Sequence, residues 1–285
     1  MKKILVTGSE GFLASRFIKR YNDQYDITAL SRKELDITNE SAIYQLFKNK
    51  RFDLVFHSAA ISNTMSCEEQ PDLAQHINTL GTQLIARGCE LQGSKLIFTS
   101  SDQVYNGTVE CGPYLENQAC PNSVYAHTKF EAEKRIANEL DSYYNLRLTW
   151  LFSLPESHLR LNQNVFMNII NAVQNKTPLS MAAHEFRGMT YVYDVIDQLI
   201  PMLQQPYGTY NFGSENDLCS ATIGKEIAKR LYPTYASDSI VITDFERFKD
   251  SPRDLRISTD KLKECEIHFP TTIEGIEKCL FDFSN

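Results

Sequence analysis

Short apolar runs alternate with amphipathic runs along the first half of the chain, and this alternation predicts a parallel sheet covered by helices. The apolar runs end in small or polar residues and predict strands at 3–7, 25–30, 54–57, 95–99 and 147–151. Between them, apolar residues recur at three- and four-residue spacing and predict helices at 12–21, 40–48, 72–91 and 123–140. Because crossovers between parallel strands are right-handed, successive helices are placed on both faces of the sheet.

The second half of the chain is less regular. Helical patterns recur at 164–175, 194–203 and about 223–231, and a strand pattern lies at 209–212. No linker composition separates the two halves, so we expect the second half to form a smaller lobe interleaved with the last strands of the sheet. The expected fold is therefore α/β, with a doubly wound parallel sheet.

The composition is that of an ordinary globular protein, with 285 residues, 42% of them hydrophobic, and a formal net charge of −7. Lys and Arg are scattered evenly, which argues against a nucleic-acid-binding surface. No window approaches about 18 apolar residues, so no membrane span is predicted. The apolar start at 1–6 ends at Thr7 to Glu10, too early for a signal peptide. We therefore expect a cytoplasmic protein, either a monomer or a homodimer.

The seven cysteines are odd in number and widely spaced, with no Cys-x-x-Cys pair. This spacing predicts free thiols and no metal site. The nearest pair, Cys111 and Cys120, would form a disulfide only in an oxidising compartment, which requires a secretion signal.

A glycine pair lies at the junction between the first predicted strand and the first predicted helix. The strand runs directly into the segment Gly8-Ser9-Glu10-Gly11-Phe12-Leu13-Ala14, where Ala14 stands at the usual place of a third glycine. The phosphates of a dinucleotide need free backbone N–H groups at a helix start, and glycine leaves room for that approach. The pattern predicts cofactor contacts at Gly8, Gly11, Phe12 and Leu13.

The position of the glycine loop predicts which part of the chain binds a dinucleotide and which part binds the substrate. We expect a Rossmann-type dinucleotide-binding domain at 1–152, with further sheet and helix elements near 188–213. The remainder, 153–285, is expected to form mostly a substrate-binding lobe.

The end of the second predicted strand bears on the choice of cofactor. An acidic residue there accepts the ribose hydroxyls of NAD, whereas a cation accommodates the 2′-phosphate of NADP. The sequence at this point is Leu30-Ser31-Arg32-Lys33, and Arg32 with Ser31 is suited to bind a phosphate. We therefore expect NADP(H) to be preferred, with NAD(H) possible; the alternative is that Arg32 and Lys33 form only a solvated turn.

A tyrosine and a lysine lie four residues apart at the start of the helix predicted at 123–140. Tyr125 and Lys129 therefore share one helical face. The preceding strand ends in Thr99-Ser100-Ser101, at the carboxyl edge where parallel sheets bind ligands. This context makes the pair a candidate catalytic site.

The chain resembles the extended short-chain dehydrogenases/reductases, and among them the dTDP-4-dehydrorhamnose reductase-like group. The resemblance covers nearly the whole length. It is carried by Thr7 to Leu13, Leu35-Asp36-Ile37-Thr38, His57-Ser58-Ala59-Ala60, Ser100 to Gly107, Tyr125 with Lys129, Leu148-Thr149-Trp150, and Ser251 to Leu255.

The resemblance implies a catalytic triad. Tyr125 is the acid that protonates the substrate carbonyl, and Lys129 lowers the pKa of Tyr125 and holds the nicotinamide ribose. Ser101 hydrogen-bonds the carbonyl, with Ser100 as the fallback. His57, His76 and His127 are not expected to take part, since none has a suitably spaced partner.

The resemblance also implies binding residues. Asp36 and Ile37 flank the adenine, Ala59 and Ala60 lie under the cofactor, and Trp150 lies beside the sugar. Asn78 resembles an Asn that braces the site, although a structural hydrogen bond explains it equally well. In the second lobe, Arg187 and Arg253 are expected to hold the substrate, because arginine binds phosphate bidentately.

The expected activity is NADP(H)-dependent reduction of a nucleotide-activated 4-keto-6-deoxy sugar, as in dTDP-rhamnose biosynthesis. Gln103 stands where sugar-nucleotide dehydratases carry a Glu, which disfavours dehydration, and the divergent segment 61–68 leaves the particular sugar open. The alternatives are an NAD(P)-dependent sugar-nucleotide epimerase and a non-catalytic NADP-binding regulatory subunit.

Overall fold

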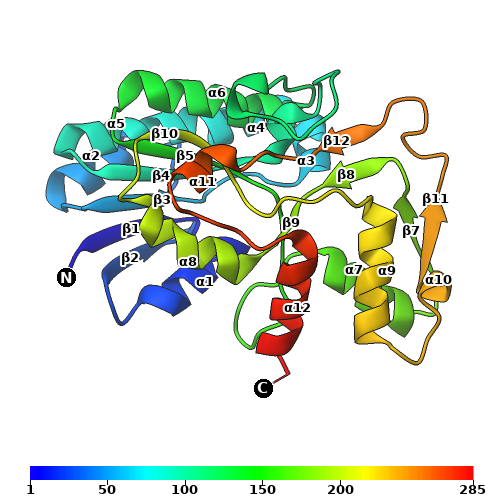
Figure 1. Ribbon diagram of the computed structural model, residues 1–285. Coiled ribbons are helices and arrows are strands. Elements are labelled where there is room, and N and C mark those ends of the chain that lie inside the picture. Colours follow the sequence, from blue (N-terminus) through cyan, green and yellow to red (C-terminus); the bar gives the residue numbers. More distant parts are fainter. Residues whose placement is uncertain (285) are drawn as a thin grey trace.

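The structure is a computed structural model that describes residues 1–284, and it contains the expected doubly wound sheet (Figure 1). Six parallel strands lie in the order β2-β1-β3-β4-β5-β10. Their bounds are β1 Lys3–Thr7, β2 Asp26–Leu30, β3 Leu54–His57, β4 Lys95–Ser101, β5 Tyr143–Leu148 and β10 Gly208–Phe212.

Helices cover both faces of the sheet, because alternate residues of each strand pack in opposite directions. In β1, Ile4 and Val6 belong to one hydrophobic cluster and Leu5 belongs to the other. The first cluster is covered by α1 (Phe12–Tyr21) and α8 (Val192–Met202). The second is covered by α2 (Glu40–Asn49), α5 (Thr82–Gln92) and α6 (Val124–Glu139), and Figure 1 shows the two layers on either side of the sheet. Burial on both faces explains why these strands are continuous apolar runs in the sequence.

The helix predicted at 72–91 is divided in the structure. It consists of α4 (Pro71–Gln75), a π-helical turn at His76–Gly81 and α5, and it follows the short helix α3 (Thr64–Glu69). Within the π turn, the Asn78 amide donates to the Ile61 carbonyl at 3.0 Å and accepts from the Ile61 N–H at 2.8 Å. The same amide donates to the Thr128 hydroxyl at 3.1 Å. The turn thus ties α6 to the segment that follows β3.

The prediction of a single strand at 147–151 was wrong. β5 ends at Leu148, and a separate strand, β6 (Trp150–Phe152), pairs with β9 (Met189–Tyr191) outside the main sheet. The chain changes sheets at Thr149, whose hydroxyl is 2.5 Å from that of Thr190 in β9. Leu148, Trp150 and Leu151 give apolar positions on both sides of Thr149, so the sequence pattern does not reveal the break.

The second lobe holds the remaining helices and three two-stranded parallel pairs. Besides β6 with β9, β7 (Leu179–Ala182) pairs with β11 (Val241–Asp244), and β8 (Glu185–Arg187) pairs with β12 (Arg253–Leu255). The predicted helical patterns correspond to α7 (Val165–Gln174), α8 and α9 (Ser220–Leu231). The chain is completed by the short elements η2 Asp102–Tyr105, η3 Glu116–Gln118, α10 Ser237–Ile240 and α11 Asp260–Glu264, and by the longer helix α12 Thr272–Asp282.

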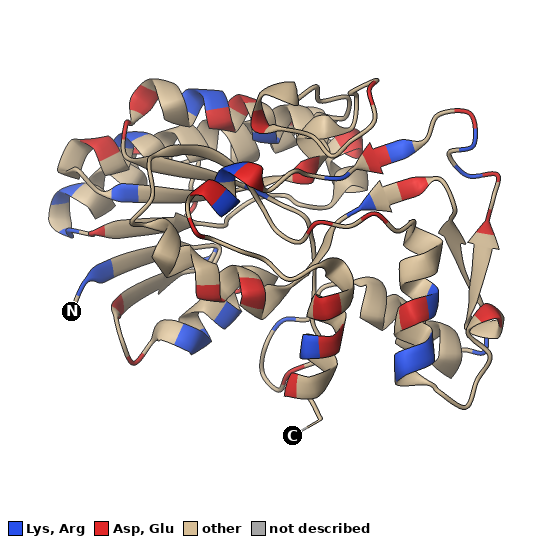
Figure 2. Cartoon of the chain, in the orientation of Figure 1, with Lys and Arg blue, Asp and Glu red and all other residues tan. Residues whose placement is uncertain are grey.

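Charged residues of both signs are interspersed over this fold, as Figure 2 shows. The seven cysteines are free thiols. Among residues 1–284, the structure has no helix that is long and apolar enough to cross a membrane.

His57, at the end of β3, is fully buried between two hydroxyl groups. Its Nδ1 lies 2.6 Å from Thr7 Oγ1 and its Nε2 lies 2.9 Å from Thr82 Oγ1. Burial lowers the pKa of His57 from 6.5 to about 3, so the ring is neutral in the folded protein near pH 7. The histidine therefore has a structural role.

We predict a pH-dependent stability that comes from His57. Between pH 6.5 and 3 the unfolded chain binds a proton that the folded chain rejects, so this group costs about 2 kcal/mol of stability between pH 7 and pH 5. Urea denaturation at both pH values should show that His57→Gln loses less stability on acidification than the wild type. The exposed His127→Gln is the control, and equal losses in all three proteins would contradict the prediction.

Candidate active site

The glycine loop joins β1 to α1 at the carboxyl edge of the sheet. Gly8 has a φ of +66°, and a Cβ at this position would lie 2.8 Å from backbone atoms of Ala59, which follows β3. At Gly11, no side chain among residues 1–284 caps α1, so the N–H groups of its first turn remain available to an anion. A backbone cradle that a Cβ would fill, opening on an uncapped helix start, fits the phosphates of a dinucleotide. Phe12 and Leu13 are buried behind it.

A carboxylate that the sequence analysis overlooked lies at the end of β2. Glu34 folds back so that Oε2 accepts from the Ser31 N–H at 2.8 Å and from the Ser31 hydroxyl at 2.7 Å. These hydrogen bonds lower the pKa of Glu34, so it is ionised at neutral pH. Ser31 is therefore already paired with an acid, whereas Arg32 is exposed beside it. The Ser-x-x-Glu spacing of Ser31 and Glu34 is a local signal for such a contact, and the sequence analysis did not use it.

The other predicted cofactor residues line the ends of β2 and β3. Asp36 is exposed and accepts from the N–H and hydroxyl groups of Thr38, which lower its pKa. Ile37 is buried. Ala59 and Ala60 are half-buried directly after β3. The structure thus gathers the predicted cofactor residues at one edge of the sheet.

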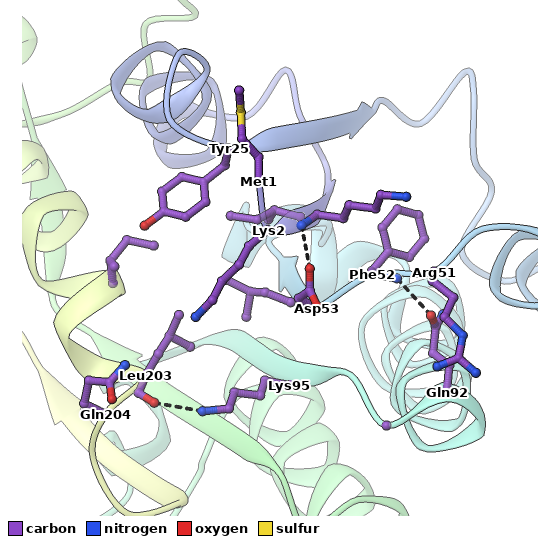
Figure 3. Close-up of a pocket in the computed structure, with 15 residues that line it drawn as sticks. Met1, Lys2, Tyr25, Arg51, Phe52, Asp53, Gln92, Lys95, Leu203 and Gln204 are labelled. Atoms are coloured by element: carbon purple, nitrogen blue, oxygen red, sulfur yellow. Dashed lines mark hydrogen bonds between the residues drawn. The ribbon is translucent and has the colours of Figure 1, made fainter.

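The loop after β6 was not identified from the sequence as part of a pocket. His158 and Arg160, from the loop after β6, line a pocket of about 440 Å³ together with Ser9 and Glu10 of the glycine loop. A larger cavity, about 560 Å³, lies at the opposite edge of the sheet and is lined by Lys2, Asp53 and Lys95 among others (Figure 3). It contains none of the predicted site residues.

Ser101 and Tyr125 come from separate elements that meet at the carboxyl edge. Ser101 ends β4, and its hydroxyl accepts from the Gln103 N–H at 3.2 Å and contacts Asp102 Oδ1 at 3.3 Å. Tyr125 and Lys129 lie on α6 and are 8% and 2% exposed. Lys129 Nζ lies 4.3 Å from the centre of the Phe98 ring in β4. Strand β4 and helix α6 therefore place the predicted catalytic side chains against each other.

Burial dominates the electrostatics of this site. It raises the pKa of Tyr125, while a hydrogen bond from Ser101 and the charge of Arg187 oppose that rise. Burial also lowers the pKa of Lys129 to about 7, with Glu133 acting in the opposite direction. The pKa of Tyr125 is therefore raised in this structure and not lowered, because the dry environment disfavours the tyrosinate, as it disfavours the charged form of Lys129.

Ser100, the fallback for Ser101, points to a different partner. Its hydroxyl donates to Glu133 Oε1, and Glu133 is also paired with Arg147, whose Nη2 lies 2.7 Å from Glu133 Oε2. Glu133 lies eight residues after Tyr125 on α6, so Ser100 meets this helix about two turns beyond Tyr125, whereas the hydrogen bond to Tyr125 comes from Ser101.

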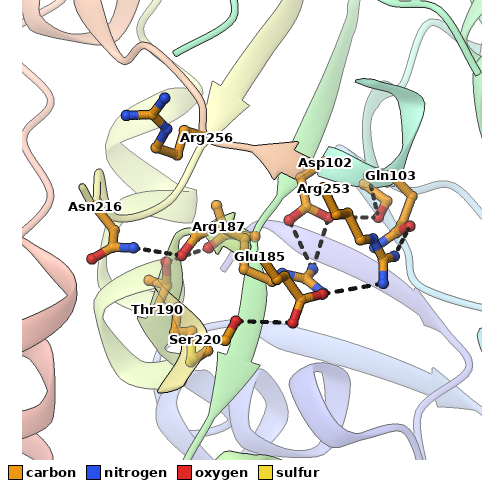
Figure 4. A network of polar contacts seen from close by, with 12 residues as sticks. Asp102, Gln103, Glu185, Arg187, Thr190, Asn216, Ser220, Arg253 and Arg256 are labelled. Atoms are coloured by element: carbon orange, nitrogen blue, oxygen red, sulfur yellow. Dashed lines mark hydrogen bonds and ion pairs between the residues drawn. The ribbon is translucent and has the colours of Figure 1, made fainter. Parts of the chain in front are cut away.

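Arg187 and Arg253 lie together beside the segment that follows Ser101 (Figure 4). Arg187 Nη2 lies 3.0 and 2.8 Å from the two oxygens of Asp102, and its guanidinium carbon lies 5.4 Å from the centre of the Trp150 ring. Arg253 donates to Gln103 Oε1 at 2.9 Å and to Glu185 Oε1 at 3.1 Å. Both arginines therefore contact the two residues that follow Ser101, and Arg187 also lies beside Trp150. The carboxylate partners of the arginines were not anticipated.

Residues 1–284 contain no group of three or more His, Cys, Asp or Glu side chains that could hold a metal ion. What the site offers is a buried hydroxyl donor, a phenol and a lysine next to a dinucleotide cradle. These groups suit hydride transfer coupled to protonation of a carbonyl.

Comparisons with known proteins agree with this assignment. The family described as RmlD substrate binding domain matches residues 1–284. The dTDP-4-dehydrorhamnose reductase of Aggregatibacter actinomycetemcomitans is 23% identical over 280 residues, 93% of each chain. The spore coat polysaccharide biosynthesis protein SpsK of Bacillus subtilis is 26% identical over 222 residues, covering 77% of this chain and 76% of that protein.

Solved structures show the same fold. A dTDP-4-dehydrorhamnose reductase from Bacillus anthracis in complex with NADP has a TM-score of 0.86 and 23% identity, with 99% of each chain covered. A UDP-glucose 4-epimerase from Thermus thermophilus in complex with NAD has a TM-score of 0.80 and 21% identity, again over 99% of each chain.

The fold and the family together define an NAD(P)-dependent oxidoreductase of the extended short-chain dehydrogenase/reductase class. The chain belongs to the RmlD substrate binding domain family, whose match extends over nearly its full length.

We predict that Lys129→Met removes activity but does not destabilise the fold. The pKa of Lys129 is lower in the folded protein than in the unfolded chain, so the buried ammonium costs stability below its usual pKa of 10.5. Replacing it with an apolar side chain should raise the free energy of unfolding at pH 7 by about 1–4 kcal/mol. The gain should shrink as the pH rises from 7 and should vanish above the unfolded-state pKa of 10.5, where the wild-type lysine is neutral in both states. A clear loss of stability in urea denaturation at pH 7 would contradict this.

Proposed function

We propose that this protein reduces the ketone of a nucleotide-activated 4-keto-6-deoxy sugar with NADP(H). This is the reaction type of the dTDP-4-dehydrorhamnose reductases and would place the chain in dTDP-rhamnose biosynthesis. The observation that carries the proposal is the meeting of Ser101 with Tyr125 and Lys129 beside the glycine loop, in a member of the RmlD family. The active unit is a monomer or a homodimer.

Each member of the triad has a distinct task in this proposal. When bound, NADPH supplies a hydride to the carbonyl carbon. Tyr125 donates its phenolic proton to the carbonyl oxygen, so that the ketone becomes a hydroxyl group. Ser101 donates a hydrogen bond to the same oxygen and favours the charge that develops on it. Lys129, when protonated, stabilises the tyrosinate that is left behind.

The substrate is proposed to lie between the sheet edge and the second lobe. Residues 1–152, with elements near 188–213, hold the cofactor, and residues 153–285 provide most of the substrate contacts. Trp150 lies beside the sugar ring, and Arg253 is the better placed arginine for the diphosphate. Its side chain is 32% exposed, compared with 12% for Arg187, so it can reach a ligand without being extracted from a buried ion pair.

The cofactor preference depends on two opposite charges after β2. Arg32 is exposed and suits the 2′-phosphate of NADP, whereas the Glu34 carboxylate on Ser31 suits the ribose hydroxyls of NAD. We propose that Arg32 gives NADP(H) the advantage and that Glu34 limits it, so that NAD(H) also binds.

Two substitutions test the cofactor proposal. Arg32→Ala should weaken NADPH binding by about 10-fold or more and leave NADH binding nearly unchanged, because it removes a charge-assisted hydrogen bond to the extra phosphate. Glu34→Gln should strengthen NADPH binding, because it removes a like charge. The fluorescence of Trp150, the single tryptophan, provides the titration signal. Arg51→Ala, at the opposite edge, is the control. Equal losses for both cofactors in Arg32→Ala would refute the assignment.

The central test is the oxidation of NADPH with dTDP-4-keto-6-deoxy sugar prepared in situ. Tyr125→Phe should reduce kcat by about 10²- to 10⁴-fold, because it removes the acid, and should leave the dissociation constant of NADPH unchanged. Tyr143→Phe, a half-buried tyrosine at the start of β5, is the matched control. Activity that survives in Tyr125→Phe would eliminate Tyr125 as the proton donor.

An epimerase is the second candidate, and Glu34 is the observation that favours it, since an acid after β2 suits a tightly held NAD. An epimerase would interconvert sugars without net NADPH consumption. A regulatory subunit would bind NADPH tightly and consume none with any keto sugar. The stoichiometry of NADPH oxidation therefore separates the reductase from the other two possibilities, and interconversion of the sugars separates an epimerase from a regulatory subunit.

A further inference from the structure

A chain of three side chains connects the second lobe to the catalytic serine. Arg187, at the end of β8, contacts both oxygens of Asp102 through its Nη2 atom (Figure 4). Asp102 directly follows Ser101, and its Oδ1 lies 3.3 Å from the Ser101 hydroxyl. The Asp102 side chain is 1% exposed, and this burial raises the pKa of Asp102, whereas Arg187, Arg253 and the hydrogen bond from Ser101 favour its charged form.

The contact between Ser101 and Asp102 competes with the proposed role of Ser101. A hydroxyl has one proton, and a proton donated to Asp102 is not available to a substrate carbonyl. The distance of 3.3 Å is long for an O–H···O hydrogen bond, which normally spans about 2.5–3.0 Å. The carboxylate therefore holds the Ser101 proton only weakly while it is paired with Arg187.

The charges around this site favour the same conclusion. Arg187 and Arg253, from β8 and β12, are the cations that face Asp102. Tyr125 is faced by Asp102, by Arg187 and by the Cys67 thiol of α3. Asp102 opposes formation of the tyrosinate, whereas Arg187 favours it. An Asp102 carboxylate without Arg187 would thus hinder both proposed hydrogen donors.

Taking these contacts together, we propose that Arg187 is a positioning residue that keeps the Asp102 carboxylate away from the Ser101 proton, so that Ser101 can donate to the substrate carbonyl. This rests on the proposed function. Arg187 acts through Asp102 and does not touch the substrate, which separates its role from that of Arg253. Because β8 belongs to the second lobe, the catalytic serine is ready to donate only when that lobe is correctly seated.

The kinetic test uses the same substitution at two arginines. Arg187→Gln should lower kcat by about 10- to 100-fold with little change in KM, because a donor to the developing oxyanion is lost. Arg187→Lys should keep most of kcat, since one nitrogen makes both contacts to Asp102. Arg256→Gln is the control: Arg256 pairs with Asp254 at 2.7 Å in the same lobe but points away from Asp102 in Figure 4. Equal kcat values for Arg187→Gln and Arg256→Gln would overturn the inference.

A double variant separates positioning from mere stabilisation. In Asp102→Asn/Arg187→Gln the competing charge is absent, so kcat should recover to within a few-fold of the wild type. If Arg187 only holds the lobe in place, the double variant will be as slow as Arg187→Gln or slower, and the proposal fails.

An NMR titration of Asp102 needs no substrate, and it therefore distinguishes failure of this inference from failure of the proposed function. The carboxyl ¹³C signal of Asp102, assigned with Asp102→Asn, is titrated by NMR in the NADP-bound protein. Loss of Arg187 should raise the apparent pKa of Asp102 by about 1–3 pH units, whereas Arg256→Gln should not. An unchanged titration overturns the inference. A shifted titration in a protein that reduces no keto sugar instead leaves Arg187 in control of Asp102 and refutes the proposed function.

Discussion

The buried ion pair between Glu133 and Arg147 fixes α6 against the sheet, and the geometry of the candidate site depends on it. The two side chains are 4% and 3% exposed. Ser100 of β4 donates to the same carboxylate, so a helix and two strands meet at one charged group. Removing one partner of such a pair leaves a buried charge uncompensated, at a cost of about 3–5 kcal/mol. Tyr125 lies opposite Ser101 because its helix is held at this point.

The site itself contains charges that do not favour folding. Lys129 is buried against the ring of Phe98, and its pKa is lowered to about 7 because the ammonium has lost its water. Asp102 is equally buried and depends on Arg187 for compensation. Such groups are tolerated where a reaction needs a lysine and a carboxylate with perturbed protonation. The hydrophobic clusters on both faces of the sheet stabilise the fold and offset the free-energy cost of burying these charges.

The two lobes meet through polar contacts near the reacting groups. The Arg187 contact with Asp102 and the Arg253 contact with Gln103 join β8 and β12 to the segment after β4. On the cofactor side, Glu156 after β6 accepts from Arg16 and Lys19 of α1 at 2.8 Å each. The second lobe therefore contacts both helix α1, which follows the glycine loop, and the segment next to Ser101. Through these two contacts the second lobe is joined to the proposed cofactor site and to the proposed catalytic site.

The sequence by itself determined the strands β1 and β3, the helix α1, the glycine loop and the Tyr125–Lys129 pair, because each depends on local periodicity or on residues a few positions apart. Only the tertiary structure decided that the chain breaks at Thr149, that Asn78 lies in a π turn, and that Arg187 pairs with Asp102. The protonation of Lys129 also belongs to this second group. The physical reason is that hydrogen bonds, ion pairs and desolvation depend on which distant residues meet and how much water remains between them. A one-dimensional pattern of apolar and polar positions does not contain that information.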